Sequence, residues 1–164
     1  MKDLKAKQIA RFVLIVLIII NCIVIFEFSS EQSVKSSDRS GRIVEKIVEI
    51  NPRTKNLKGS EREKVKESLI TPIRKSAHFL VYTNLGMLLI LCSKTFDIKN
   101  KKRILVSFML AFLYACTDEI HQLFVSGRSC EFRDVCIDSC GALAGILIGS
   151  ILYKIVFKIV KKQN

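Results

Sequence analysis

The residues best suited to chemistry in this sequence form a short stretch of carboxylate, imidazole and amide side chains. Asp118, His121 and Gln122 are spaced i, i+3 and i+4, so a helix would place them on one face. Glu119 would point elsewhere. A carboxylate beside an imidazole is the minimal acid–base pair, although the same pairing also orients structural histidines. His121 is therefore the candidate general base, with Asp118 as the group that orients it.

A second stretch supplies cations. Arg74 and Lys75 follow Thr71-Pro72, which we predict to be the N-cap and first residue of a helix. The helix dipole disfavours positive charge there. Either these side chains extend to lipid phosphates, or they form an anion site with free backbone N–H groups. His78 and Tyr82 continue the face of Arg74 at four-residue intervals.

A third stretch combines acidic and small residues. Asp134 and Asp138 are four residues apart, and Gly141 and Gly145 continue the same helical stripe. Small residues at this spacing let helix backbones approach closely in membranes. We therefore expect the aspartate face to be pressed into a bundle, with Arg128 in the preceding turn.

Long apolar segments must position these residues. Hydrophobic residues make up 49% of the 164 residues, and they occur in long blocks. A bilayer core of roughly 30 Å needs about 20 apolar helical residues to cross it. Four segments qualify, at about 9–28, 72–92, 104–124 and 135–160. The sequence predicts an all-α integral membrane bundle of four transmembrane helices, with a long outer loop between helices 1 and 2.

The chain divides accordingly into four parts. These are an N-terminal tail and first transmembrane helix (1–28), an extracytoplasmic amphipathic segment (29–71), a three-helix core (72–160) and a basic cytoplasmic tail (161–164). Within 29–71, apolar pairs between Ile43 and Val48 recur at helical spacing. Ser60-x-x-Glu63 predicts a capping box that opens a short helix through about Ile70. We expect two amphipathic helices on the membrane surface.

The net charge of +12 reflects lysines and arginines near the ends of the spans. Basic residues are dense before the first span, within Lys94–Arg103 and from Lys154 onward. The positive-inside rule makes this side cytoplasmic, so we expect a multi-pass protein of the cell membrane with both termini inside. The basic residues of 29–75 oppose this assignment, but they are more widely spread. No nucleic-acid-binding motif accompanies the charge.

Six cysteines are present, and no two form a C-x-x-C pair. Cys22 and the other cysteines within the predicted spans are expected to behave as small hydrophobic residues. Cys130, Cys136 and Cys140 cluster near one membrane face, and the sequence leaves a disulfide among them open.

The polar stretches should meet. Because span direction alternates, the start of the second span, the end of the third and the start of the fourth fall at one membrane face. Charged side chains inside a bilayer are costly and usually paired. We therefore expect Arg74 or Arg128 to lie within hydrogen-bond reach of Asp118, Asp134 or Asp138.

These stretches also carry a recognisable pattern. They read Arg74-Lys75-x2-His78-Phe79-x2-Tyr82, Asp118-Glu119-x-His121-Gln122-x-Phe124-x2-Gly127-Arg128 and Asp134-x3-Asp138-x2-Gly141. Over about residues 72–145 this pattern closely resembles the VanZ-like membrane protein family, named for a protein associated with teicoplanin resistance. The resemblance implies a cell-membrane protein and a role in lowering glycopeptide susceptibility. It supplies no biochemical mechanism.

The favoured hypothesis is that the protein binds or handles an anionic envelope lipid or wall precursor at its outer face, without a cofactor. Arg74, Lys75 and Arg128 would hold the anion, while the histidines and aspartates shape the pocket. The full set of candidate ligand-binding residues is Arg74, Lys75, His78, Tyr82, Asp118, Glu119, His121, Gln122, Arg128, Asp134 and Asp138.

Two other hypotheses use the same residues. A membrane hydrolase or transferase would employ the Asp118–His121 pair, although no nucleophile motif is recognisable. A structural partner in an envelope complex would use the polar cluster only to lock helices together. A metal site built on His78 and His121 is not expected, because these histidines do not pair at ligand spacing.

Cysteine labelling tests the predicted orientation. In a cysteine-free background, a cysteine at Ser37 should react with an impermeant thiol reagent in intact cells, because this segment is predicted to be outside. A cysteine at Lys101 should react only after permeabilisation. The reverse pattern would contradict the orientation.

Overall fold

The structure, a computed structural model, describes residues 2–163 of the chain as an all-helical protein. Its helices are α1 (Lys2–Ser30), α2 (Ser33–Ile50), α3 (Gly59–Ser93), α4 (Asn100–Gln122) and α5 (Phe132–Gln163). Four of them, all but α2, are long and apolar enough to cross a membrane. The predicted all-α bundle of four spanning helices is confirmed.

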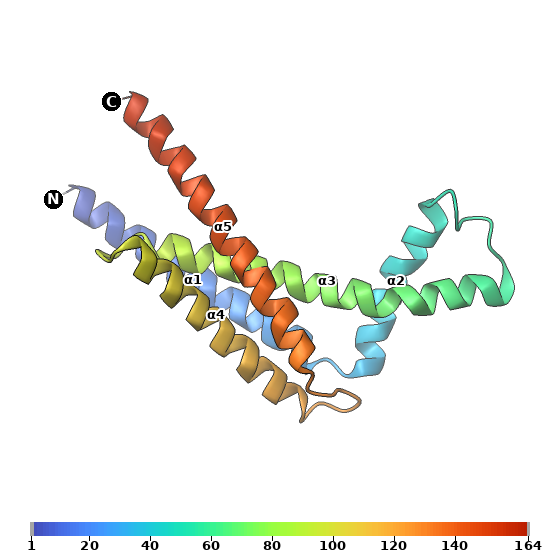
Figure 1. The fold of residues 1–164 in the computed structure, drawn as a ribbon. Coiled ribbons are helices and arrows are strands. Elements are labelled where there is room, and N and C mark those ends of the chain that lie inside the picture. Colours follow the sequence, from blue (N-terminus) through green and yellow to red (C-terminus); the bar gives the residue numbers. More distant parts are fainter. Residues whose placement is uncertain (1, 164) are drawn as a thin grey trace.

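The helices run so that alternate connections lie at opposite ends of the bundle (Figure 1). One end carries the start of α1, the α3–α4 connection and the end of α5. There, Arg11 of α1 donates to the carbonyl oxygen of Thr95 at 2.7 Å, and the Lys94 ammonium lies 5.2 Å from the ring centre of Tyr153. The opposite end carries the α1–α2 and α4–α5 connections, and all the predicted polar stretches converge there.

Helix α5 crosses α3 in direct backbone contact (Figure 1). A Cβ atom added to Gly145 would overlap the backbone of Thr83, and one added to Gly141 would overlap that of Phe79. Gly86 of α3 meets the backbone of α5 in the same way. The prediction that Gly141 and Gly145 face another helix is therefore confirmed, and that helix is α3.

Polar side chains fasten α1 to the other spans. Asn84 donates to the side-chain oxygen of Asn21 at 2.6 Å, and Asn21 donates to the carbonyl oxygen of Val81 at 3.3 Å. The Tyr114 hydroxyl of α4 donates to the carbonyl oxygen of Cys22 at 2.7 Å. Such bonds specify helix pairing where lipid and protein interior are equally apolar.

Helix α3 contradicts the predicted start of the second span. It runs for 35 residues without interruption and contains Pro72 in its interior. Proline removes one backbone hydrogen bond, but the preceding turns are held on the same axis by their contacts with α2. The amides near Arg74 therefore belong to the helix interior, and the anion site built on free N–H groups is wrong.

The predicted capping box is also wrong. Helix α3 begins at Gly59, whose φ of +57° favours glycine, and its N-cap residue Lys58 makes no side-chain capping bond. Ser60 and Glu63 therefore lie inside the first turns and do not cap the helix.

The first part of α3 instead forms a helical hairpin with α2, in which the two helices cross steeply (Figure 1). Val44 and Val48 of α2 are fully buried. Glu45 accepts bonds from Arg62 and Lys66 at 2.5 Å each, and the Lys66 and Arg62 charges hold the pKa of Glu45 below its usual range. Only α2 is a separate helix here, so the expected pair of independent surface helices is corrected to a helical hairpin.

This hairpin extends beyond the bundle. At 1.5 Å per residue, α3 is about 52 Å long, whereas the hydrocarbon layer is roughly 30 Å thick. The hairpin lies past the ends of α1, α4 and α5 (Figure 1).

All six cysteines are free in the structure. Cys92 is buried, and the three near the α4–α5 connection, Cys130, Cys136 and Cys140, are exposed.

The glycine contact predicts a sharp difference between two neighbouring substitutions on α5. Gly145→Leu should reduce the yield and melting temperature of folded protein, because its side chain would collide with the α3 backbone. Ile148→Leu is the control, since Ile148 is 45% exposed. Yield and thermal unfolding of the detergent-purified variants measure the effect. Equal tolerance of both would contradict close helix packing.

Candidate functional site

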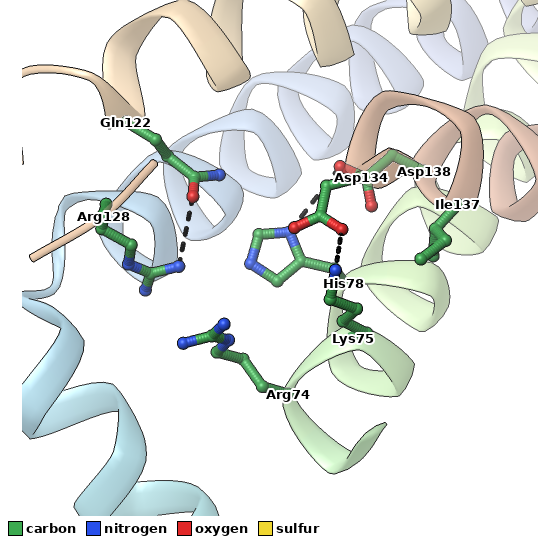
Figure 2. Close-up of a pocket in the computed structure, with 8 residues that line it drawn as sticks. All are labelled: Arg74, Lys75, His78, Gln122, Arg128, Asp134, Ile137 and Asp138. Carbon is green, nitrogen blue, oxygen red and sulfur yellow. Dashed lines mark hydrogen bonds and ion pairs between the residues drawn. The ribbon is translucent and has the colours of Figure 1, made fainter. Parts of the chain in front are cut away.

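A polar pocket lies between α3, the end of α4, the α4–α5 connection and the start of α5 (Figure 2). Its cavity volume is about 10 Å³, roughly what one water molecule or ion requires. The lining residues are Arg74, Lys75, His78, Gln122, Arg128, Asp134, Ile137 and Asp138. All of them except Ile137 are among the residues predicted from sequence, so three distant stretches do meet at one end of the bundle.

Lys75 is neutralised by acidic residues. Its ammonium forms ion pairs with Asp134 and, at 3.2 Å, with Glu131. The Lys75 charge in turn lowers the pKa of Glu131. Lys75 therefore already has carboxylate partners, and it supplies the ion pair to Asp134 that had been expected from Arg74 or Arg128. That expectation of an arginine–aspartate pair is wrong.

Arg128 is held by neutral oxygen atoms. Its guanidinium donates to the carbonyl oxygens of Phe28 and Glu31, each at 3.2 Å, and to the side-chain oxygen of Gln122 at 3.3 Å. Burial and then the nearby Arg74 charge lower the pKa of Arg128. The guanidinium thereby joins the end of α1 to the α4–α5 connection while its positive charge stays unpaired.

Arg74 faces the same pocket from α3, across from Arg128 (Figure 2). Among residues 2–163, no carboxylate oxygen lies within ion-pair distance of either guanidinium. Two arginines thus share a partly buried pocket without an acidic partner, an arrangement that attracts an anion.

His78 lies next to two buried aspartates. Its Nδ1 atom is 3.7 Å from an oxygen of Asp138, and one ligand atom from each of His78, Asp118 and Asp138 lies within 4.8 Å of the others. Asp138 is 1% exposed, and within the described chain neither of its carboxylate oxygens has a hydrogen-bond partner. The fully buried Tyr82 hydroxyl is unpartnered by the same measure.

Asp118 and His121 do not form the predicted acid–base pair. Asp118 accepts a hydrogen bond from Ser29 at 2.7 Å. His121 Nε2 lies 3.0 Å from the Ser30 hydroxyl, and its ring stacks on Phe26 with 4.6 Å between ring centres. Helix α1 packs on this face of α4, and its Ser29 and Ser30 contact Asp118 and His121 separately. The histidine near Asp118 is His78.

Ser29 and Ser30 are contributors that the sequence analysis missed. They lie one and two residues beyond the predicted end of the first span, at position 28. The signal was a pair of hydroxyls at a span end on the same membrane face as the aspartates.

Glu119 holds the α4–α5 turn and does not line the pocket. It is 1% exposed and accepts hydrogen bonds from the backbone N–H of Glu131 at 2.9 Å and the amide of Gln122 at 3.1 Å. Its predicted ligand-binding position is therefore occupied by bonds within the protein. Tyr82 and His121 also lie outside the pocket lining.

An apolar groove of about 170 Å³ adjoins the pocket between α1, α2 and α3. Phe28, Ile43, Ile73 and Ala77 supply its apolar wall. The groove shares Arg74 and His78 with the polar pocket, so the apolar groove and the charged pocket adjoin at these two residues. The remaining lining residues are Glu31, Ser36, Arg39 and Ser40.

The Glu119 contacts predict a stability effect. Glu119→Ala should cost about 1–3 kcal/mol, because it leaves the Glu131 amide without its partner. Glu131→Ala is the control, since it keeps the backbone N–H and removes an exposed side chain. Thermal unfolding and hydrogen exchange at residue 131 measure both. A larger loss in Glu131→Ala would contradict the assignment.

Comparison with known proteins agrees with the pattern of these residues. No curated protein and no solved structure matches the chain. The family model described as VanZ/LLP1 matches residues 12–154. That range covers most of the first and fourth spanning segments, all of the second and third, and every residue of the pocket, and the chain therefore belongs to the VanZ/LLP1 family of membrane proteins.

Proposed function

We propose that this protein binds an anionic amphiphile of the cell envelope, either a phospholipid or a lipid-linked wall precursor. The phosphate would lie between Arg74 and Arg128, and the hydrocarbon chain would lie in the adjoining apolar groove. The observation that carries this proposal is that both guanidiniums line one pocket and, within residues 2–163, neither forms an ion pair with a carboxylate.

The charges around the pocket favour a ligand from outside the chain. Desolvated charges at a membrane boundary are rarely left uncompensated. Asp134, a half-buried carboxylate of the lining, is engaged by Lys75. Phosphate oxygens match the forked guanidinium geometry, which an ammonium cannot reproduce. The cavity admits about one oxygen atom, so the headgroup would rest at its mouth.

The groove explains why the ligand should be an amphiphile. Its wall is mainly apolar, and it begins at Arg74 and His78, which also line the polar pocket. A soluble anion would fill only the pocket. A lipid would satisfy the arginines and cover the groove with one molecule.

This assignment also gives a route to the antibiotic phenotype implied by the family. The positive-inside rule predicts both termini inside the cell, and in that orientation the pocket faces outward, where wall precursors and glycopeptides meet. Holding such a lipid there would change what a glycopeptide such as teicoplanin can reach. We do not propose catalysis, because the Asp118–His121 pair on which the enzyme hypothesis depended is not formed.

Lipid titration tests the proposal. Protein in nanodiscs of phosphatidylcholine should bind fluorescent undecaprenyl phosphate or phosphatidylglycerol. Arg74→Gln and Arg128→Lys should each weaken binding about tenfold, equivalent to 1.4 kcal/mol. Arg133→Gln is the matched control, because Arg133 is at the same end of α5 but outside the pocket.

The comparison of ligands separates the sources of the phosphate. Preference for undecaprenyl phosphate indicates a wall precursor, and equal binding indicates a general anionic-lipid site. Competition by inorganic phosphate as strong as by lipid would show that the groove contributes nothing. Unchanged affinity in both pocket variants, or equal binding of a zwitterionic lipid, would overturn the proposal.

A further inference from the structure

We infer that His78, Asp118 and Asp138 form a binding site for one divalent transition-metal ion that prefers nitrogen and oxygen ligands, such as Mn²⁺ or Zn²⁺. The three side chains come from α3, α4 and α5. His78 and Asp138 also line the pocket proposed for the lipid phosphate, whereas Asp118 does not. The metal site is tested by metal binding alone, with no lipid present.

The geometry of the three groups suits a single ion. Their candidate ligand atoms lie within 4.8 Å of one another. Ligands bound to one ion at about 2.1 Å are separated by at most about 4.2 Å. Small side-chain rotations therefore bring all three atoms into coordination distance. The backbone contact between α3 and α5 fixes His78 and Asp138 on facing turns.

Asp138 is buried with one weak partner. It is 1% exposed, His78 Nδ1 lies 3.7 Å from one of its oxygens, and within residues 2–163 neither oxygen receives a hydrogen bond. A buried carboxylate is normally paired or metal-bound. Within the same residues, the Tyr82 hydroxyl, one turn beyond His78, is also buried without a hydrogen-bond partner.

Among residues 2–163, none of the neighbouring cations Arg74, Lys75 and Arg128 forms an ion pair with Asp118 or Asp138. Lys75 is paired with Asp134 and Glu131, and Arg128 donates to two carbonyl oxygens and Gln122. Two carboxylates therefore face one imidazole. Their combined charge equals that of one divalent cation, so binding would neutralise the cluster.

The surroundings resemble the support that metal ligands require. The Ser29 hydroxyl donates to one oxygen of Asp118 at 2.7 Å, which orients the carboxylate and leaves it able to coordinate. His78 and Asp138 also line the water-sized cavity, which leaves room for a water ligand and an entry path. One imidazole with two carboxylates favours Mn²⁺ or Zn²⁺ over soft, thiolate-binding ions.

The competing explanation is a metal-free cluster in which a shared proton removes one charge. The two explanations differ in what divalent ions do to the wild type and in what Asp138→Asn changes. In a metal-free cluster, this substitution should raise the melting temperature, and divalent ions should not affect the wild type. In a metal site, it should abolish metal-dependent stabilisation.

The experiment uses full-length protein purified in detergent, treated with EDTA and dialysed. Mn²⁺ is the probe, because it binds oxygen and nitrogen ligands in preference to the exposed cysteine thiols. Electron paramagnetic resonance measures the free and the bound ion. We expect one Mn²⁺ per chain and an increase in melting temperature. Asp138→Asn and His78→Phe should weaken binding at least about 100-fold, and Ser29→Ala about tenfold.

Two controls locate the ion. His121→Gln removes the other histidine, and Asp134→Asn removes the carboxylate one turn before Asp138 on α5; both should bind Mn²⁺ like the wild type. Co²⁺ spectra of the wild type provide a readout that needs no variant to fold, and should show nitrogen and oxygen ligation without thiolate bands. Absence of Mn²⁺ and Co²⁺ binding at millimolar concentration, or full binding by folded Asp138→Asn, would overturn the inference.

Discussion

The architecture depends on one steric constraint, the backbone contact between α3 and α5. Three glycines remove the Cβ atoms that would otherwise separate these helices. In a bilayer there is no hydrophobic gain from bringing apolar helices together, so dispersion forces and polar contacts must supply the attraction, and both require close approach. The same contact places His78 opposite Asp138. Helix packing and polar chemistry are therefore consequences of a single arrangement of small residues.

Around this contact, the surrounding helices determine which partner each charged side chain has. Lys75 neutralises the outer aspartate, Asp134, while the inner one, Asp138, faces an imidazole. The end of α1 supplies hydroxyls and carbonyl oxygens that engage Asp118 and Arg128 without cancelling their charge. As a result, Arg74 and Arg128 line the same small cavity as Asp138, yet among residues 2–163 neither arginine forms an ion pair with a carboxylate.

The sequence predicted the spans and the meeting of the polar stretches, because bilayer thickness and alternating direction leave few alternatives. It also predicted that Gly145 faces another helix, since helical periodicity places this glycine on the same face of its helix as Asp134 and Asp138. It failed where partners had to be chosen. Asp118 and His121 share a helical face, but which hydroxyl or imidazole each meets depends on how α1 packs, which no local spacing encodes. Likewise Pro72 favoured a helix start locally, and contacts with α2 kept the helix continuous through it.

That continuity has a mechanical consequence. Because α3 is one uninterrupted helix, the hairpin outside the bundle and Arg74 at the pocket belong to the same element. That element packs on α5 at the glycine contact. Residues of α2, among them Ser36, Ser40 and Ile43, also form one wall of the apolar groove. Any force that tilts the hairpin therefore changes the width of the groove and the position of Arg74 together. Helix α3 thus connects the hairpin outside the bundle directly to the polar pocket.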